Sequence, residues 1–243
     1  MKYIYVTYAL ILFVGLFLLF LPFFFILSLF GGKGKKMIWG LVRFWALIWF
    51  PLVGIFNKNI YEHKPEKGKR YVVVINHQSF LDTPLILRVI PFFGRPLATA
   101  EYSKIPLFGF LYRQYAVLIN RSNLRSKAEG FLRMNYILKN EASIIIFPEG
   151  KFNKTDLPIA TFYDGAFKLA IDLNANILPI LFLDAAKLWN PKSFWSLRPG
   201  NHRAVFLKEM NPNDFDNDLD KFKEEIHLIM SKKIVEYKKL KNR

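Results

Sequence analysis

The chain of 243 residues contains no cysteine. This absence excludes disulfide bonds, thiolate metal sites, iron–sulfur clusters and cysteine nucleophiles. Negative charge is also scarce, because 35 Lys and Arg residues against 19 Asp and Glu residues give a formal net charge of +16. Hydrophobic residues make up 52% of the chain, and this proportion excludes a disordered protein. The positive excess indicates an anionic partner: lipid head groups, nucleic acid or a phosphorylated substrate.

A long uncharged segment lies near the N-terminus. No residue from Ile4 to Phe30 is charged, and about 20 apolar residues are enough for a helix to cross a bilayer. The run is longer than the apolar part of a signal peptide, and no small-residue cleavage motif follows it. We therefore predict a retained membrane anchor. Lys33, Lys35 and Lys36 come next, which favours the cytoplasmic face of the inner or plasma membrane.

A second apolar stretch, from Met37 to Phe56, is interrupted by Arg43. Arg is costly at the centre of the hydrocarbon layer, and Trp, which occurs three times here, favours membrane interfaces. The stretch is either a second complete span or, more compatibly with Arg43, an interfacial helix or a shallow re-entrant hairpin. The predicted organisation is a membrane anchor over 1–56, made of one span plus an interfacial or re-entrant helix. A polar linker over 57–70 and a catalytic domain over 71–243, which ends in an amphipathic helix, follow it.

After the linker, short β-branched runs alternate with helical patterns. The runs at 71–76 and 143–147 have the composition of buried strands. Alternating strands and helices predict an α/β fold, a mixed sheet flanked by helices and preceded by the membrane helices. Ligands of such sheets collect at the carboxyl ends of strands. The other predicted elements are strands over 96–101, 115–120, 177–183 and 204–207, and helices over 83–89, 126–138, 165–173 and 219–240.

One histidine directly follows a strong strand pattern. His77 ends the run YVVVINH, and Asp82 stands five residues later. A turn between them can bring the carboxylate to one ring nitrogen, which fixes the tautomer and leaves the other nitrogen free to accept a proton from an alcohol. Asp82 is equally suited to capping a helix that starts at Thr83-Pro84. The two roles are compatible, and both stay open.

Two further segments place polar groups next to predicted strand ends. Glu149 and Gly150 follow the strand over 143–147, at the same sheet edge as the histidine. The alternative is a simple turn with Glu149 on the surface. Lys104 begins the segment KIPLFG, and Arg121 ends the next strand, where it is suited to bidentate phosphate contact. The alternative for Arg121 is a surface cation.

Together these segments resemble the glycerophospholipid acyltransferase family typified by the bacterial 1-acyl-sn-glycerol-3-phosphate acyltransferase. NHQSFLD is similar to the N-H-x-x-x-x-D block of that family, KIPLFG with INR to its second block, FPEG to its third and NILPI to its fourth. The resemblance implies a glycerolphosphate acyltransferase-like fold. It also implies transfer of a fatty acyl group from acyl-CoA or acyl carrier protein to a lysophospholipid hydroxyl. With 1-acyl-sn-glycerol-3-phosphate as the acceptor, the product would be phosphatidic acid.

The resemblance also implies residue roles. His77 would be the general base, and Asp82 would orient it. The implied acceptor-binding residues are Lys104 and Arg121 at the phosphate, with Glu149, Gly150 and Lys151 along the acceptor site. The implied partners are the lysophospholipid, the acyl donor and the lipid bilayer. No cofactor, metal or nucleic acid is expected.

One departure from the family pattern bears on the acceptor. After FPEG the family continues Thr-Arg-Ser, whereas this chain has Lys151-Phe152-Asn153. Phe152 thus replaces an Arg that helps to bind phosphate, and Lys151 supplies a positive charge one residue earlier. Another lysolipid acceptor, such as a lyso-amino-lipid, therefore stays open. An alternative of a different class is a non-catalytic anchor protein that binds anionic lipids through its basic surface.

Overall fold

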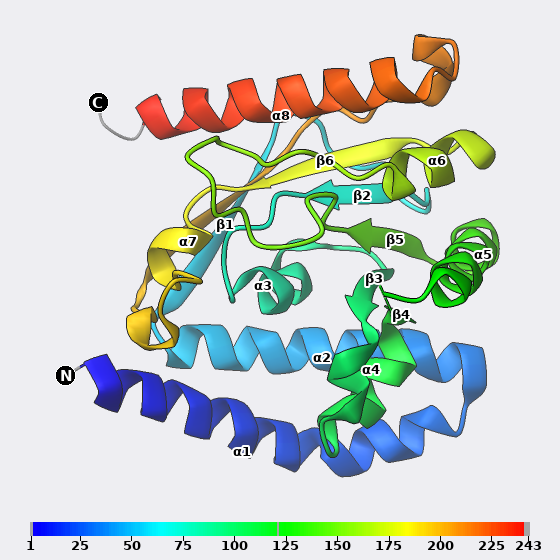
Figure 1. Cartoon of the computed structure of the whole chain (residues 1–243). Coiled ribbons are helices and arrows are strands. Elements are labelled where there is room, and N and C mark those ends of the chain that lie inside the picture. The colour runs from blue at the N-terminus through cyan, green and yellow to red at the C-terminus, as the bar shows by residue number, and fades with distance from the viewer. Residues whose placement is uncertain (1, 121, 241–243) are drawn as a thin grey trace.

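The computed structural model describes residues 2–120 and 122–240, and these residues form a mixed sheet with helices on both faces (Figure 1). The strands are β1 (Ile55–Tyr61), β2 (Val72–Ile75), β3 (Gly94–Thr99), β4 (Val117–Ile119), β5 (Ser143–Ile146), β6 (Ile177–Phe182) and β7 (Gly200–Phe206). The described strands form a seven-stranded sheet in the order β1-β7-β6-β2-β5-β3-β4. β6 and β7 are antiparallel, and the other neighbours are parallel. The predicted mixed α/β fold is confirmed.

The helices divide between the two faces of the sheet. They are α1 (Lys2–Ser28), α2 (Gly31–Leu52), α3 (Asp82–Val89), α4 (Phe108–Tyr115), α5 (Leu124–Asn140), α6 (Gly165–Asp172), α7 (Ala185–Leu188) and α8 (Leu219–Leu240), with 3-10 turns η1 (Ala100–Lys104), η2 (Phe194–Ser196) and η3 (Pro212–Phe215). The α1–α2 hairpin, α3 and α4 pack on one face, and α5, α6 and α8 pack on the other. Strand β2 contributes to the hydrophobic core on each face of the sheet. Val73 and Ile75 face the core under the α1–α2 hairpin, and Val72 and Val74 face the core under α5, α6 and α8.

The predicted linker over 57–70 is wrong in its first part. Residues 57–61 belong to β1, which pairs in parallel with β7 from Ile55 opposite Gly200 to Tyr61 opposite Phe206. β1 is an edge strand with one described neighbour, so most of its side chains are exposed or half-buried, and its polar composition hides it in the sequence. The α/β body therefore begins at Ile55, directly after α2.

Helix α2 packs against the body. Arg43, which argued against a second span, donates from Nε to the carbonyl of Leu87 at 3.2 Å and from Nη1 to the carbonyl of Pro91 at 3.2 Å. Its charge thus meets free carbonyls at the C-terminus of α3. The three Trp residues of α2 are buried rather than interfacial, and Trp49 donates to the carbonyl of Ala9 in α1. Among the described helices, α1 alone has the length and hydropathy of a membrane span.

Candidate active site

The register of two parallel strands brings the histidine and the FPEG turn together. Val74 of β2 pairs with Ile146 of β5. His77 and Glu149, each three residues further on, therefore lie side by side at the ends of the two strands. The backbone N–H of His77 donates to Glu149 Oε1 at 2.6 Å. The carbonyl of His77 accepts from the N–H of Asn153 at 2.8 Å. The segment after β5 therefore holds the histidine backbone from both sides.

His77 and Asp82 form a hydrogen-bonded pair. His77 Nδ1 lies 2.8 Å from Asp82 Oδ2, which also accepts the N–H groups of Gln78 at 2.6 Å and Ser79 at 2.8 Å. The carboxylate thus turns back to the histidine instead of capping the helix that begins at Asp82. Its pKa is raised by complete burial, and the hydrogen bonds from His77, Ser79 and Gln78 oppose this effect. With Nδ1–H bound to a carboxylate, Nε2 is the nitrogen available to accept a proton.

Glu149 does not line the acceptor site as the resemblance implies. It is buried, and its two oxygens accept the backbone N–H groups of His77 and Ala160, the latter at 2.7 Å. The interpretation as a surface turn residue is therefore wrong. Burial raises the pKa of this carboxyl to about 7. The side chain faces backbone instead of the cavities described next, so it acts on the site by positioning His77.

Two adjoining cavities open at the carboxyl edge of the sheet. One, of about 310 Å³, is lined by His77 together with η1, α3 and the FPEG turn. The other, of about 530 Å³, lies between α5 and the start of α6. Gly150 and the exposed Lys151 line both. These two residues thus line the same cavity as the histidine. Gly150 has φ +68°, a value that favours glycine.

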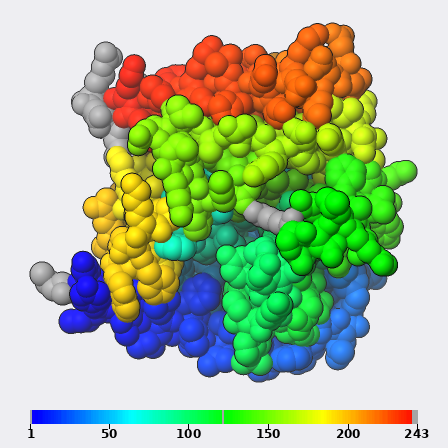
Figure 2. Space-filling view, in the orientation of Figure 1, coloured from blue at the N-terminus to red at the C-terminus, as the bar shows by residue number. Residues whose placement is uncertain are grey.

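Aromatic rings enclose the imidazole of His77. Phe147 stacks on it with ring centroids 4.2 Å apart, and Phe152 lies against it at 4.4 Å. Phe152 in turn contacts Phe80, and Phe80 contacts Phe194 of η2. An aromatic path therefore runs from the histidine to the 185–198 segment, which rests on the N-terminal half of α1 (Figure 2).

Of the two expected phosphate-binding residues Lys104 and Arg121, the structure describes Lys104 alone, and it does not bring this residue into the site. Lys104 ends η1 with an exposed side chain and does not line either cavity. Its neighbour Tyr102 does line the cavity of His77. Arg121 lies outside the described residues, so its predicted role stays a prediction.

Sequence reasoning missed two residues that support the histidine. Asn76 is buried, and its side chain donates to the carbonyl of Phe182 at 3.0 Å and accepts the N–H of the same residue at 2.7 Å. It thereby ties the end of β2 to β6. Ser79 Oγ donates to the carbonyl of Trp189 at 2.6 Å, which ties the turn after His77 to the 185–198 segment. Asn76 could have been identified from the sequence, because it is a polar residue directly after a buried strand.

The fold and the histidine–aspartate pair define an enzyme class. The chain belongs to the acyltransferase family, whose sequence model matches residues 56–183. It is 31% identical over 153 residues to a 1-acyl-sn-glycerol-3-phosphate acyltransferase of Chlamydomonas reinhardtii, covering 63% of this chain and 46% of that protein. It is 29% identical over 190 residues to a chloroplastic 1-acyl-sn-glycerol-3-phosphate acyltransferase of Arabidopsis thaliana, covering 77% and 52%. The chain spans about half the length of these two relatives.

A solved structure shares the whole fold. The crystal structure of the 1-acyl-sn-glycerophosphate acyltransferase from Thermotoga maritima matches with a TM-score of 0.78 over 98% of each chain, at 21% identity. The match includes the N-terminal helices, because it covers nearly all of this chain. At this identity the similarity establishes the fold alone.

Proposed function

We propose that the protein transfers a fatty acyl group from a thioester, acyl-CoA or acyl carrier protein, to the free hydroxyl of 1-acyl-sn-glycerol-3-phosphate, giving phosphatidic acid. The observation that carries the proposal is the His77–Asp82 pair at a cavity. The names of the relatives support the choice of acceptor. The pair itself argues against the non-catalytic alternative, since simple lipid binding needs no oriented base.

The reaction needs no covalent enzyme intermediate. His77 Nε2 takes the proton of the acceptor hydroxyl as its oxygen attacks the thioester carbonyl, and Asp82 stabilises the imidazolium. The C–O bond forms, the C–S bond breaks, and the imidazolium returns the proton to the departing thiolate. The buried hydrogen bonds to Asp82 Oδ2 hold the imidazole in one orientation throughout.

Lys104, Arg121 and Lys151 are the proposed cations for the acceptor phosphate. Lys151 has the strongest support, because it lines the cavity of His77. The same cavity favours a second candidate, another lysolipid acceptor. Phe152, where the family has an Arg, places an apolar ring on the imidazole, so the phosphate receives less positive charge there than the family pattern implies.

We infer further that the α1–α2 hairpin is the membrane-contacting element, with the body on the cytoplasmic side. The side of α1 away from α2 carries exposed apolar residues, among them Ile11 and Leu19 at 66% and 65% exposure. Both ends of α1 contact the body, through Tyr3 with Trp195 at 5.1 Å and Phe25 with Phe110 at 4.3 Å. If α1 crossed the bilayer completely, its contacts would draw the body into the bilayer. This packing therefore supports a hairpin that enters the bilayer from one side and does not cross it.

The substitution His77→Ala tests the enzyme assignment. In purified protein with acyl-CoA and 1-acyl-sn-glycerol-3-phosphate, we expect the rate to fall by about 10²- to 10⁴-fold, because a general base contributes this much. His63→Ala, in the loop after β1, is the matched control and keeps the wild-type rate. Unchanged activity in His77→Ala would refute the enzymatic mechanism.

A panel of lysolipids assayed with both thioester donors then decides the acceptor. We expect phosphate-bearing 1-acyl-sn-glycerol-3-phosphate to be preferred over acceptors that lack phosphate. Preference for a phosphate-free acceptor would overturn the acceptor assignment and leave the acyl-transfer chemistry in place.

A further inference from the structure

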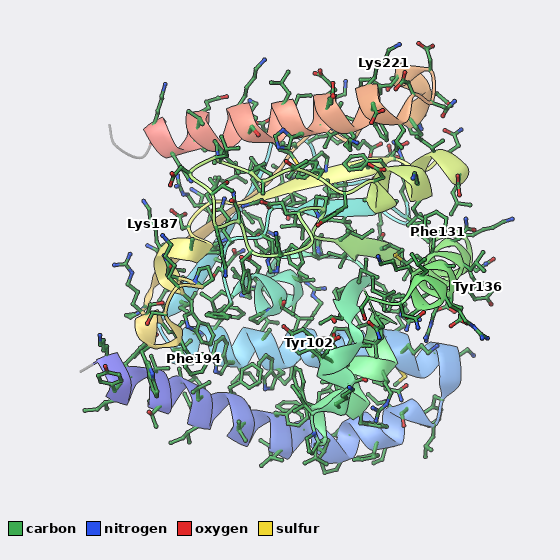
Figure 3. The ribbon with its side chains drawn as sticks, viewed as in Figure 1. Tyr102, Phe131, Tyr136, Lys187, Phe194 and Lys221 are labelled. Carbon is green, nitrogen blue, oxygen red and sulfur yellow. The ribbon has the colours of Figure 1, made fainter. Side chains whose placement is uncertain are left out.

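Helix α5 carries an apolar stripe on the side that faces away from the protein. Met134, Ile137 and Leu138 bury its other side against the sheet. The outward stripe consists of Leu124, Ala128, Leu132 and Tyr136, four residues apart and all exposed. Leu124, Leu132 and Tyr136 are 81%, 69% and 60% exposed. Figure 3 shows Tyr136 on the outer side of the helix. Since the stripe extends over about 18 Å at 1.5 Å per residue, it is long enough for one partner helix.

Positive charge lies within and beside this stripe. At 100° per residue, Arg125 and Lys139 lie among the stripe residues and Arg133 lies beside the stripe, whereas Lys127 lies on the cavity side of the helix. All four side chains are exposed. The helix carries one acidic residue, Glu129, which pairs with Arg125 at 2.8 Å. An apolar stripe with three cations within or beside it is complementary to an acidic surface with a small apolar patch.

The same helix forms a wall of the larger cavity. Lys127, Phe131 and Met134 line the cavity of about 530 Å³, which shares Phe147, Gly150 and Lys151 with the cavity of His77. A partner on the outer side of α5 would therefore sit beside the opening that leads to the base. Helix α5 lies beside the sheet, away from helix α1, whose exposed side we assign to the membrane (Figure 1).

We propose that the outer side of α5 is the docking surface for an acidic acyl carrier protein, which delivers its thioester through the adjoining cavity. This inference rests on the proposed function and selects one of its two donors. Acyl-CoA has no protein surface to place on the stripe. A lipid surface as the occupant is an outcome of the test below.

The test compares two donors and two double variants. Leu132→Ser with Arg133→Glu removes part of the stripe and reverses one border charge. Leu228→Ser with Lys232→Glu on α8 makes the same changes on another exposed helix face. With acyl carrier protein as donor, the α5 variant should lose at least about tenfold in kcat/KM, mainly through KM. This loss corresponds to about 1.4 kcal/mol, which a single hot-spot residue of an interface can contribute. With acyl-CoA it should stay within about twofold of wild type. The α8 variant should match wild type with both donors.

A binding titration of purified wild type and both variants with holo acyl carrier protein completes the test. We expect binding that weakens with salt in wild type and is lost in the α5 variant alone. Three results would each overturn the docking assignment. The first is an equal loss of kcat/KM with both donors, and the second is an α5 variant that binds the carrier like wild type. The third is an α5 variant whose sole defect is weaker association with anionic vesicles. Activity with acyl-CoA but neither activity nor binding with the carrier would overturn it while the proposed function stands. Absence of transfer with both donors would instead count against the proposed function, and the titration would still decide the docking surface.

Discussion

The histidine of the NHQSFLD segment is held at three points. Its backbone N–H meets Glu149, its carbonyl meets Asn153, and its ring meets Asp82. The ring contact could be predicted from the sequence, because five residues and one turn separate the two side chains. The contact with Glu149 could not, because it depends on the register of two strands about 70 residues apart. The same carboxylate also reaches Ala160, so it links two segments of the site.

A pH dependence follows from the buried carboxyl of Glu149. Its pKa is raised by burial from 4.5 to about 7. Between these values the folded protein holds the proton more tightly than the unfolded chain, so the contribution of Glu149 to the free energy of unfolding falls as the pH rises through this window. The full change is about 3 kcal/mol. Glu149→Gln cannot ionise, so its stability should change less between pH 5 and pH 8 than that of wild type.

Chemical unfolding in detergent at the two pH values measures this effect. Glu224→Gln, an exposed substitution on α8, is the control and should keep the wild-type pH dependence. An unchanged pH dependence in Glu149→Gln would show that the pKa of this carboxyl is the same in the folded protein and in the unfolded chain.

Among the elements, the turn from η1 into α4 is the most constrained near the site. A Cβ atom on Gly109 would lie 2.1 Å from the carbonyl oxygen of Ser103, so only glycine permits the close approach. Leu107 has φ +60°, a conformation that is strained for a side chain of this size. This geometry gives the segment KIPLFG a structural reason for its glycine. It also holds Tyr102 at the cavity of His77.

Gly109→Ala should therefore disturb η1. The clash is with backbone, which cannot move aside without shifting the turn, so we expect a loss of about 1–3 kcal/mol in stability and a higher KM for the proposed lysolipid acceptor. Gly40→Ala in α2 is the matched control, because no atom lies within 4 Å of its added Cβ. Thermal unfolding and acceptor titrations compare the two variants. Equal behaviour would contradict the structural account of this turn.

Elements with strong patterns were predicted closely. The helix expected over 126–138 is α5 (Leu124–Asn140), and the strand expected over 143–147 is β5 (Ser143–Ile146). The sequence did not reveal β1 or α4. β1 is a polar edge strand, and α4 begins at Phe108, within the KIPLFG motif. Contacts with distant parts of the chain stabilise both elements more than their local sequence does.

At the scale of the whole molecule, the N-terminal helices and the sheet form one packed body. Tyr5 donates from α1 to the carbonyl of Val53, and Trp49 links α2 back to α1. The α2 helix then packs on α3, α4 and β1. The α1–α2 hairpin is therefore continuous with the sheet and its flanking helices instead of being joined to them by a free linker.

This packing predicts where the ends of α1 lie when the protein is in a membrane. The chain has no cysteine, so the single substitutions Lys2→Cys and Gly32→Cys can each be labelled with a membrane-impermeant maleimide in oriented vesicles. We expect both to react from the same side as the control Lys232→Cys on α8, because both ends of α1 lie against the body. Labelling of Lys2→Cys and Gly32→Cys from opposite sides would contradict the hairpin and establish a complete crossing.

The sequence by itself determined the residue types of the site and most of the sheet, because hydrophobic periodicity and short motifs are local properties. It placed His77 and Asp82 five residues apart after a strand, so that a single turn can bring their side chains together. Only the tertiary structure decided that Glu149 faces backbone, that Arg43 meets the end of α3, and that Phe152 covers the imidazole. Each of these contacts joins segments distant in the chain, and their positions depend on strand register and helix packing that no local pattern encodes.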